Sequence, residues 1–290
     1  MSIGQRVLGR TRLLVSEIGI GCEHLKRVRR DKIASIVREA SANGINYFDL
    51  VWSLPTVLQG VADGIEGQRR NVHLTVHLGS GHVNGKYKRS RKPDECERFF
   101  EDALSVLHTD YADIANIHYV KDLGVWKEVR ENGVVDLAVR LKESGRARAV
   151  GISTHDTHVI QLAIETGALD VVTYQVNMAN HELPGRDDAL KMCADRGVGV
   201  VAMKPFAGGK LLQCRKKVRI AKYQTGGITV DTKIPAGVTP ANCLGYVLSR
   251  PGVCTTITGV SSLGELHSIL AYPDASQAEK DYSQVLKELI

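Results

Sequence analysis

The sequence contains few aromatic residues and no long hydrophobic run. Phe, Trp and Tyr together make up 5% of the 290 residues, and neither a basic helical stripe nor a nucleic-acid-binding motif accompanies them. We therefore expect no nucleic-acid partner. No uninterrupted apolar stretch reaches the roughly 18 residues that a membrane-spanning helix needs, so we expect no membrane partner either.

Paired cysteine motifs are also missing. None of the cysteines forms a C-x-x-C pair, which leaves zinc-ribbon and iron–sulfur frameworks without support. Arg6, Arg10 and Arg12 interrupt the apolar residues near the N-terminus, so no signal peptide is predicted. We interpret the cysteines as reduced core residues of a cytoplasmic protein: Cys22, Cys96, Cys193, Cys214, Cys243 and Cys254.

The charge and the length are those of a globular protein with a slight excess of basic residues. The net charge is +6, the isoelectric point is about 9.0, and 43% of the residues are hydrophobic. A mildly basic surface explains this charge, and attraction of an anionic ligand such as a phosphorylated cofactor is the alternative. We expect one domain over residues 1–290, because α/β barrels of this size often fold as single units.

Short apolar runs alternate with longer amphipathic segments along the chain. Near-continuous apolar strands in such an alternation predict a parallel sheet, and eight of them over this length predict a (β/α)8 TIM barrel. The opening residues 6–19 are expected to form a β-hairpin before the first barrel strand. The expected barrel strands are 17–21, 45–49, 72–77, 112–118, 148–153, 170–175, 198–204 and 254–259.

The segments between these strands have the pattern of helices, and several of them end in Gly, the residue that commonly follows a helix terminus. Two other segments, 78–94 and 213–237, do not fit the alternation. Both are long, and 78–94 is rich in Gly, Lys and Arg. Each is interpreted as either a lid over the active face or a mobile surface loop. The expected helices include 31–44, 94–107, 135–145, 157–167 and 186–197.

Polar residues follow almost every expected strand. The carboxyl ends of the strands form the active face of a barrel, so these side chains are predicted to converge on one site. Each alone would more often be structural. The set consists of Cys22, His24, Asp49, His77, His118, Ser153, His155, Gln175, Asn177, Lys204, the loop 205-PFAGGK-210, Gly259, Ser261 and Ser262.

Several motifs resemble the aldo-keto reductase superfamily over nearly the whole chain. They include 44-GINYFD-49, 109-TDYADIANIH-118, 144-SGRARAVGISTH-155 and 203-MKPFAGGKL-211. The GGK loop and the ending TTITGVSS resemble a bacterial branch that often carries a C-terminal ferredoxin-like module. That module needs clustered cysteines, so this chain is expected to lack its cluster.

The resemblance implies reduction of carbonyls with a nicotinamide cofactor by an Asp, a Tyr, a Lys and a His. Asp49 and His118 match the family's Asp and His, whereas His77 stands at the Lys position. The Tyr position falls on Leu54 in one alignment and on Trp52 in another, so the phenol is missing in both. Because a carboxylate favours the charged form of a neighbouring imidazole, Asp49, His77 and His118 are predicted to supply altered acid–base chemistry.

The family holds its cofactor, here NADP or NAD, with residues that are only partly retained. Ser153 and Gln175 match the carboxamide ligands, whereas Thr154 replaces the usual Asn and Lys204 or Phe206 lies at the stacking position. The loop is expected to bind the pyrophosphate through backbone N–H groups and Lys210. The choice between NADP and NAD is left open. The predicted phosphate-side residues are Gly208, Gly209, Lys210, Gly259, Ser261 and Ser262.

The leading hypothesis is an oxidoreductase acting on a small carbonyl or alcohol. One alternative is a degenerate cofactor-binding barrel, since fold does not determine function. Another is a metal-dependent lyase, isomerase or hydrolase built on His77, His118, Asp49 and His155, although their dispersed spacing favours no metal. The substrate and the oligomeric state cannot be read from the sequence.

Overall fold

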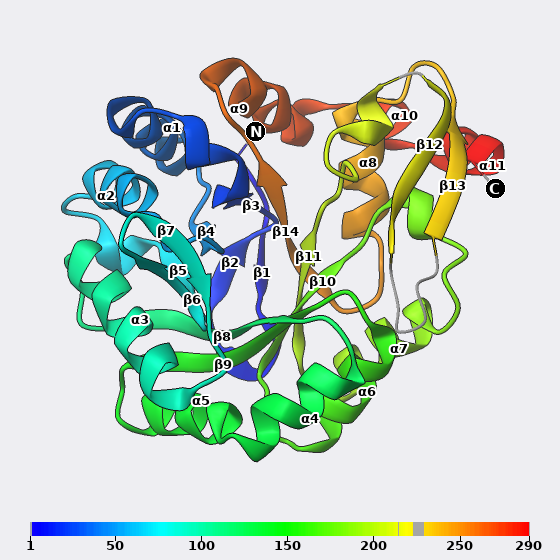
Figure 1. The fold of residues 1–290 in the computed structure, drawn as a ribbon. Coiled ribbons are helices and arrows are strands. Elements are labelled where there is room, and N and C mark those ends of the chain that lie inside the picture. The colour runs from blue at the N-terminus through cyan, green and yellow to red at the C-terminus, as the bar shows by residue number, and fades with distance from the viewer. Residues whose placement is uncertain (1, 214, 223–228, 290) are drawn as a thin grey trace.

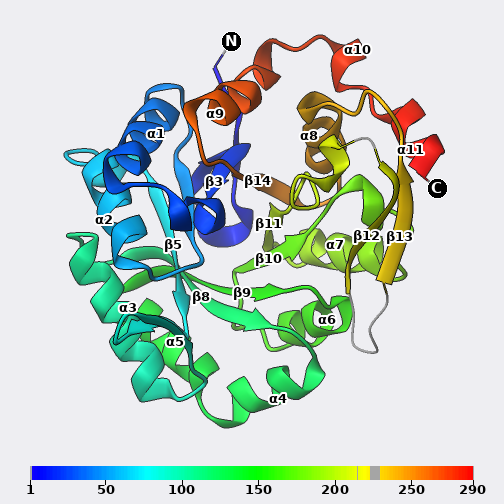
Figure 2. The ribbon, with the colours of Figure 1, turned by 45° about the horizontal axis from the view of Figure 1, so that its top comes forward.

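The computed structural model describes residues 2–213, 215–222 and 229–289. Its centre is a closed barrel of parallel strands surrounded by helices (Figures 1 and 2), as the apolar runs predicted. The first and last barrel strands pair with each other and close the barrel. Around the barrel, the strands are β3 (Ile18–Gly21), β4 (Tyr47–Leu50), β5 (His73–Leu78), β8 (Ala112–Val120), β9 (Ala147–Thr154), β10 (Val171–Gln175), β11 (Gly199–Met203) and β14 (Val253–Gly259).

The helices begin and end at residues suited to those positions. Proline opens α2 (Pro55–Gly64), α3 (Pro93–Val106) and α8 (Pro240–Leu248), where its missing N–H costs nothing. Gly145 and Gly167 follow α5 and α6 with φ of 77° and 72°, a conformation that side chains disfavour. The α-helices are α1 (Arg30–Ala42), α2 (Pro55–Gly64), α3 (Pro93–Val106), α4 (Leu123–Glu131), α5 (Val134–Glu143), α6 (Thr157–Glu165), α7 (Arg186–Asp195), α8 (Pro240–Leu248), α9 (Leu263–Leu270), α10 (Gln277–Lys280) and α11 (Ser283–Leu289).

A small hairpin closes the amino-terminal end of the barrel, as expected for residues 6–19. It consists of β1 (Gln5–Val7) and β2 (Leu14–Ser16), which pair antiparallel. Leu8, Leu13 and Val15 pack with apolar side chains of the barrel strands in a core cluster separate from the larger one. The hydrophobic effect therefore fixes the hairpin as the barrel floor.

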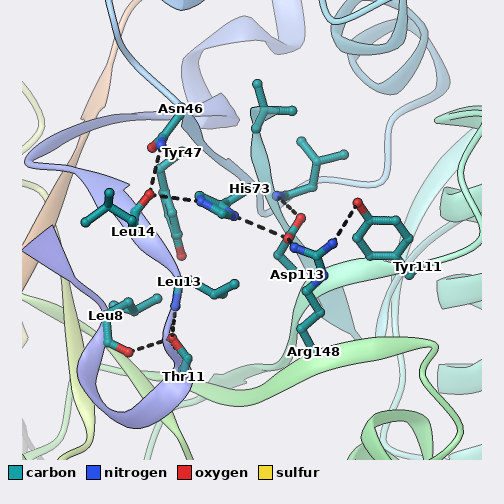
Figure 3. Close-up of polar contacts among 12 residues, drawn as sticks. Leu8, Thr11, Leu13, Leu14, Asn46, Tyr47, His73, Tyr111, Asp113 and Arg148 are labelled. Carbon is teal, nitrogen blue, oxygen red and sulfur yellow. Dashed lines mark hydrogen bonds and ion pairs between the residues drawn. The ribbon is translucent and has the colours of Figure 1, made fainter. Parts of the chain in front are cut away.

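Polar contacts tie this floor to the strands (Figure 3). His73 on β5 lies between the carbonyl of Leu14, 3.0 Å from Nε2, and the Asp113 carboxylate, 3.3 Å from Nδ1. Asp113 is fully buried, and Arg69 and Arg148 also contact it at 3.0 and 3.1 Å. A buried carboxylate with several donors is a stable arrangement, whereas an unpaired one is not.

The two segments that did not fit the alternation each contain a β-hairpin. Residues 78–94 form β6 (Ser80–Val83) and β7 (Lys86–Arg89). Within 213–237 lie β12 (Arg215–Lys222) and β13 (Thr229–Ile234), while residues 214 and 223–228 are outside the described residues. The β12–β13 pair lies near α11 in both ribbon views (Figures 1 and 2). Neither segment is therefore a loop without secondary structure, whereas a role as a lid over the active face stays a prediction.

The described cysteines are free thiols, and all except the partly exposed Cys254 are buried. Burial raises the pKa of the Cys193 and Cys243 thiols to about 12, so these side chains are inert core residues. Cys214 lies outside the described residues. Within the described ranges, no helix combines the length and the apolar content that crossing a membrane requires.

The short 3-10 helices connect these elements. They are η1 (Gly9–Thr11), η2 (Cys22–Arg27), η3 (Arg69–Asn71), η4 (Met178–Asn180), η5 (Lys210–Leu212) and η6 (Tyr272–Asp274). Of these, η2 and η5 follow β3 and β11, so their side chains help to surround the carboxyl-terminal face of the barrel.

Candidate active site

A cavity of about 430 Å³ opens among the carboxyl ends of the barrel strands. A neighbouring cavity of about 750 Å³ shares Lys204 and Gly208 with it. The convergence expected from the sequence is therefore present for most of the predicted residues. The first cavity is lined by Asp49, His77, Ser153, Lys204, Phe206, Gly208, Gly209 and Gly259, and the second adds Gln175, Lys210 and Ser261.

Asp49 and His77 form a buried pair. Asp49 Oδ2 lies 3.2 Å from His77 Nε2, and the two residues are 2% and 1% exposed. Neighbouring strands β4 and β5 carry them, which is why their side chains meet. The Asp49 carboxylate thus has the partner that a buried charge needs.

His118 extends this pair from the next strand, β8. Its Nδ1 lies 3.0 Å from Nδ1 of His77. Burial, and then the charges of His77, Arg89 and Arg91, hold the pKa of His118 well below its usual value. His118 is therefore neutral at physiological pH, with one ring nitrogen that donates and one that accepts.

Tyr87, which the sequence analysis missed, places a phenol against His118. Its hydroxyl lies 2.8 Å from His118 Nε2. The side chain comes from β7 of the hairpin that was interpreted as a loop. The sequence did contain a signal, because Asn84 and Gly85 form the hairpin turn with φ of 51° and 75°, and Asn-Gly is typical of that turn.

The structure also distinguishes the two positions expected to replace the family's Tyr. Trp52 lies beside the site, with its ring centroid 4.5 Å from that of Tyr87 in an edge contact. Leu54 instead precedes α2 and packs against the larger hydrophobic core. Trp52 is therefore the replacement nearer to the site.

The expected carboxamide ligands differ in their availability. Ser153 lines the first cavity, whereas Thr154 is fully buried and donates its hydroxyl to the Val120 carbonyl. The Thr154 hydroxyl is therefore already hydrogen-bonded, and its role in the cofactor site stays a prediction. Gln175 Nε2 is buried without a hydrogen-bond partner among the described residues. An unpaired buried amide is costly and suits a ligand carbonyl.

Lys204 is held at the end of β11 by an unusual backbone conformation, with φ of 59°. Its Nζ lies 3.4 Å from Nε2 of His155. Burial and the charge of Lys204 lower the pKa of His155 to about 3, so the imidazole is a neutral acceptor for the ammonium. Burial also lowers the pKa of Lys204, because desolvation disfavours the charged ammonium.

The glycine loop presents its backbone to the cavities. Gly208 and Gly209 have φ of 69° and 82°, and no atom would contact an added Cβ at either position. Left-handed backbone, not crowding, therefore explains these glycines. Such a turn exposes N–H groups that suit an anion, with the Lys210 cation beside them.

The predicted adenosine-side phosphate site already contains a carboxylate. Glu265 Oε2 accepts from Ser261 N at 2.7 Å and from Ser261 Oγ at 2.8 Å, while Ser262 caps α9. At Gly259, an added Cβ would lie 2.2 Å from the His24 ring, so the backbone is pressed against His24. Gly259, Ser261 and Ser262 lie between the end of β14 and the start of α9, but the donors of Ser261 are already bound to Glu265.

The histidines of the site do not form a metal centre. Across the described residues, no group of three or more His, Cys, Asp and Glu side chains is arranged to hold a metal ion. His77 and His118 direct their nitrogens at each other, at Asp49 and at Tyr87. The metal-dependent alternative therefore has no support from this geometry.

Comparisons with known proteins agree with the barrel and with the motifs. The chain is 24% identical over 300 residues to the uncharacterized oxidoreductase YqkF of Bacillus subtilis, covering 98% of this chain and 95% of that protein. It is 24% identical over 293 residues to the L-galactose dehydrogenase of Arabidopsis thaliana, covering 92% and 86%.

Solved structures show the same fold. An aldo-keto reductase from Bacillus halodurans, in its holo form, superposes with a TM-score of 0.78 at 23% identity, covering 98% of this chain and 95% of that one. A model of the Aldo/keto reductase family matches residues 17–289. Because this match spans nearly the whole barrel, the chain belongs to the aldo/keto reductase family.

Proposed function

We propose that the protein is a nicotinamide-dependent oxidoreductase that reduces a small carbonyl, or oxidises the corresponding alcohol, with an altered proton relay. The observation that carries the proposal is one cavity that joins cofactor-side residues to Asp49 and His77. Membership of the aldo/keto reductase family supports an oxidoreductase. The free thiols suit a cytoplasmic location. In this proposal, residues 1–290 act as one functional domain.

The residues present fit a nicotinamide dinucleotide. The unpaired Gln175 amide and the Ser153 hydroxyl can hold the carboxamide, and the glycine loop with Lys210 can hold the pyrophosphate. Lys204 and Phe206 occupy the wall where the ring would lie. When bound, the nicotinamide supplies or accepts the hydride.

The proton chemistry falls to the chain itself. His77 lines the cavity and holds a proton at Nε2, where the Asp49 carboxylate accepts it and orients the ring. An imidazole in this position can give that proton to a developing alkoxide. His118, kept neutral by its surroundings, contacts Nδ1 of His77 and holds that ring in place.

Fluorescence titration with NADH and NADPH tests cofactor binding, and a carbonyl panel that includes 4-nitrobenzaldehyde tests turnover. We expect saturable micromolar binding. Gln175→Leu should weaken it by about tenfold, or 1.4 kcal/mol, because it removes a hydrogen-bonding amide. Gln68→Leu, at an exposed position, is the matched control.

The outcomes separate the alternatives. No saturable signal with either cofactor would refute the proposal. Binding without turnover of any carbonyl would instead identify a degenerate cofactor-binding barrel, with the acid–base role of His77 lost.

A further inference from the structure

Four side chains form an unbroken series of polar contacts from the mouth of the barrel to the cavity. Tyr87 Oη lies 2.8 Å from His118 Nε2, the two Nδ1 atoms of His118 and His77 are 3.0 Å apart, and His77 Nε2 is 3.2 Å from Asp49 Oδ2. Each of these distances is short enough for a hydrogen bond.

The chemistry of the groups sets the direction of these bonds. An ionised Asp49 can only accept, so His77 donates to it from Nε2, which Asn116 Nδ2 also approaches to 3.3 Å. In the neutral ring, Nδ1 then accepts. His118 then donates from Nδ1, and its Nε2 must accept the hydroxyl proton of Tyr87. In this arrangement all donors point inward, from Tyr87 towards Asp49.

The two ends of this series differ in their surroundings. His77 and His118 are 1% and 3% exposed, whereas Tyr87 is partly exposed. At the other end, Asp49 and His77 line the cavity that we assign to the cofactor and the substrate. The series thus joins solvent to the proposed site of reaction.

The hairpin that carries Tyr87 is fastened to the strand end that carries Asp49. Ser53 Oγ donates to the Ser80 carbonyl at 2.6 Å, and Ser80 Oγ donates to the Val51 carbonyl at 2.8 Å. On its other side, Gly81 is pressed so closely against Phe99 of α3 that an added Cβ would lie 2.4 Å from the ring. These contacts hold the phenol in register with His118.

From this geometry we infer that Tyr87, His118 and His77 form a proton path that carries protons from solvent to the substrate oxygen. The inference rests on the proposed function, since it assigns the source of the proton used there. Tyr87 acts through His118 and is a relay residue. The inward direction of the resting hydrogen bonds suits carbonyl reduction, which consumes a proton.

A bound reduced nicotinamide would supply the hydride for the new C–H bond as the carbonyl π bond breaks, and the substrate oxygen would take the Nε2 proton of His77. His77 Nδ1 takes the proton of His118 Nδ1, His118 Nε2 takes that of Tyr87, and the phenolate takes one from water. This leaves ring protons on the opposite nitrogens. Asp49 favours the starting arrangement because its carboxylate needs a donor at His77 Nε2.

Tyr87→Phe removes the outer end of the path while retaining the ring that packs on Trp52. We expect kcat for carbonyl reduction in dilute buffer to fall by about tenfold or more, with the dissociation constant of the cofactor unchanged. Added imidazole, a mobile proton carrier, should restore much of the loss. Tyr119→Phe is the control, because its ring also contacts His118 and is partly exposed.

The possible failures are distinguishable. Wild-type kcat in Tyr87→Phe, or a loss that imidazole does not restore, would overturn the path and leave the proposed function intact. Cofactor binding without turnover of any carbonyl would overturn the path as well. Absence of cofactor binding would remove the proposed function itself.

Nitrogen-15 NMR of the wild-type histidines gives a readout that does not depend on turnover. The path requires proton-bearing shifts at His77 Nε2 and His118 Nδ1, and bare-nitrogen shifts at His77 Nδ1 and His118 Nε2. The opposite tautomer of either ring would overturn the inference even if Tyr87→Phe does not fold.

Discussion

The carboxylate of Glu265 occupies both donors of Ser261, with Oε2 2.7 Å from the backbone nitrogen and 2.8 Å from the hydroxyl oxygen. These donors start the segment expected to bind the adenosine side of the cofactor. An extra phosphate there would compete with Glu265 for the same donors and meet its negative charge, whereas a hydroxyl group could donate to the carboxylate.

We therefore expect NADH to bind more tightly than NADPH. Glu265→Gln should narrow the difference in affinity between NADH and NADPH by about twofold to fivefold, since removal of one like charge at an exposed site contributes about 0.5 to 1 kcal/mol. Parallel fluorescence titrations of both cofactors measure the ratio. Glu66→Gln, on an exposed position outside both cavities, is the control. Equal affinities in the wild type would contradict this role of Glu265.

The Asp49–His77 pair predicts an asymmetry between two substitutions. His77→Ala strands a buried carboxylate, and we expect it to lower the free energy of unfolding by about 3 kcal/mol. Asp49→Asn keeps the size of the side chain and an acceptor oxygen for His77, so it should lower the free energy of unfolding clearly less than His77→Ala does. Urea denaturation of both variants measures the difference.

A second His–Asp pair offers the comparison for that experiment. His158 lies 3.3 Å from Asp156, but its side chain is 56% exposed. His158→Ala should therefore change stability by less than about 1 kcal/mol. A similar loss in the free energy of unfolding for His77→Ala and His158→Ala would mean that burial of the Asp49–His77 pair does not increase the effect of removing its histidine.

His155 predicts a loss of stability in acid. Its folded pKa is lowered to about 3 by burial and then by Lys204, while an unfolded histidine titrates near 6.5. Between these values the unfolded chain binds more protons, so stability falls as the pH drops from about 6.5 towards 3, and this contribution is fully present above 6.5. His155→Gln keeps an acceptor for Lys204. Between pH 7.5 and 4.5, its free energy of unfolding should fall by about 1 to 2 kcal/mol less than that of the wild type. If thermal unfolding of the wild type and of His155→Gln depended on pH in the same way, the acid effect could not be assigned to His155.

Asp113 predicts a stability effect without a functional one. Although burial acts to raise its pKa, the hydrogen bond from His73 and the charge of Arg69 lower it. Asp113→Asn removes the charge that Arg69, Arg148 and His73 surround, and we expect a loss of about 3 kcal/mol. Because the residue lies at the barrel floor, the cofactor dissociation constant should not change. A weaker cofactor affinity at a temperature where the variant is folded would contradict this separation.

The barrel could be predicted from the sequence because its strands are buried on both faces. Residues 112–118 and 170–175, for example, have few charges and no helical period, which is typical of a parallel strand. The family resemblance then gave the polar residues at the strand ends their expected roles. Asp49, His77 and His118 lie close together because neighbouring parallel strands end at the same face.

The β6–β7 hairpin could not be predicted in the same way. Its strands alternate basic and other residues, as in Lys86, Tyr87 and Lys88, so composition alone indicated a loop. The contact of Tyr87 with His118 depends on the Ser53–Ser80 bonds, which join segments that no local pattern connects. Likewise, the bond from the Thr154 hydroxyl to the Val120 carbonyl joins two strands, and no local pattern in the sequence indicates it.

The pairing of β3 with β14 makes the barrel a ring that joins early and late parts of the chain. Arg6 strengthens the join, because its Nη1 donates to the carbonyls of Leu248 and Val253, each at 2.9 Å. On the ribosome, synthesis runs from the N-terminus, so β3 emerges with one edge bare and must wait until β14 has been made. An open strand edge is a template for pairing with other chains, so β3 is a place where this nascent protein is open to such pairing until translation reaches the last barrel strand.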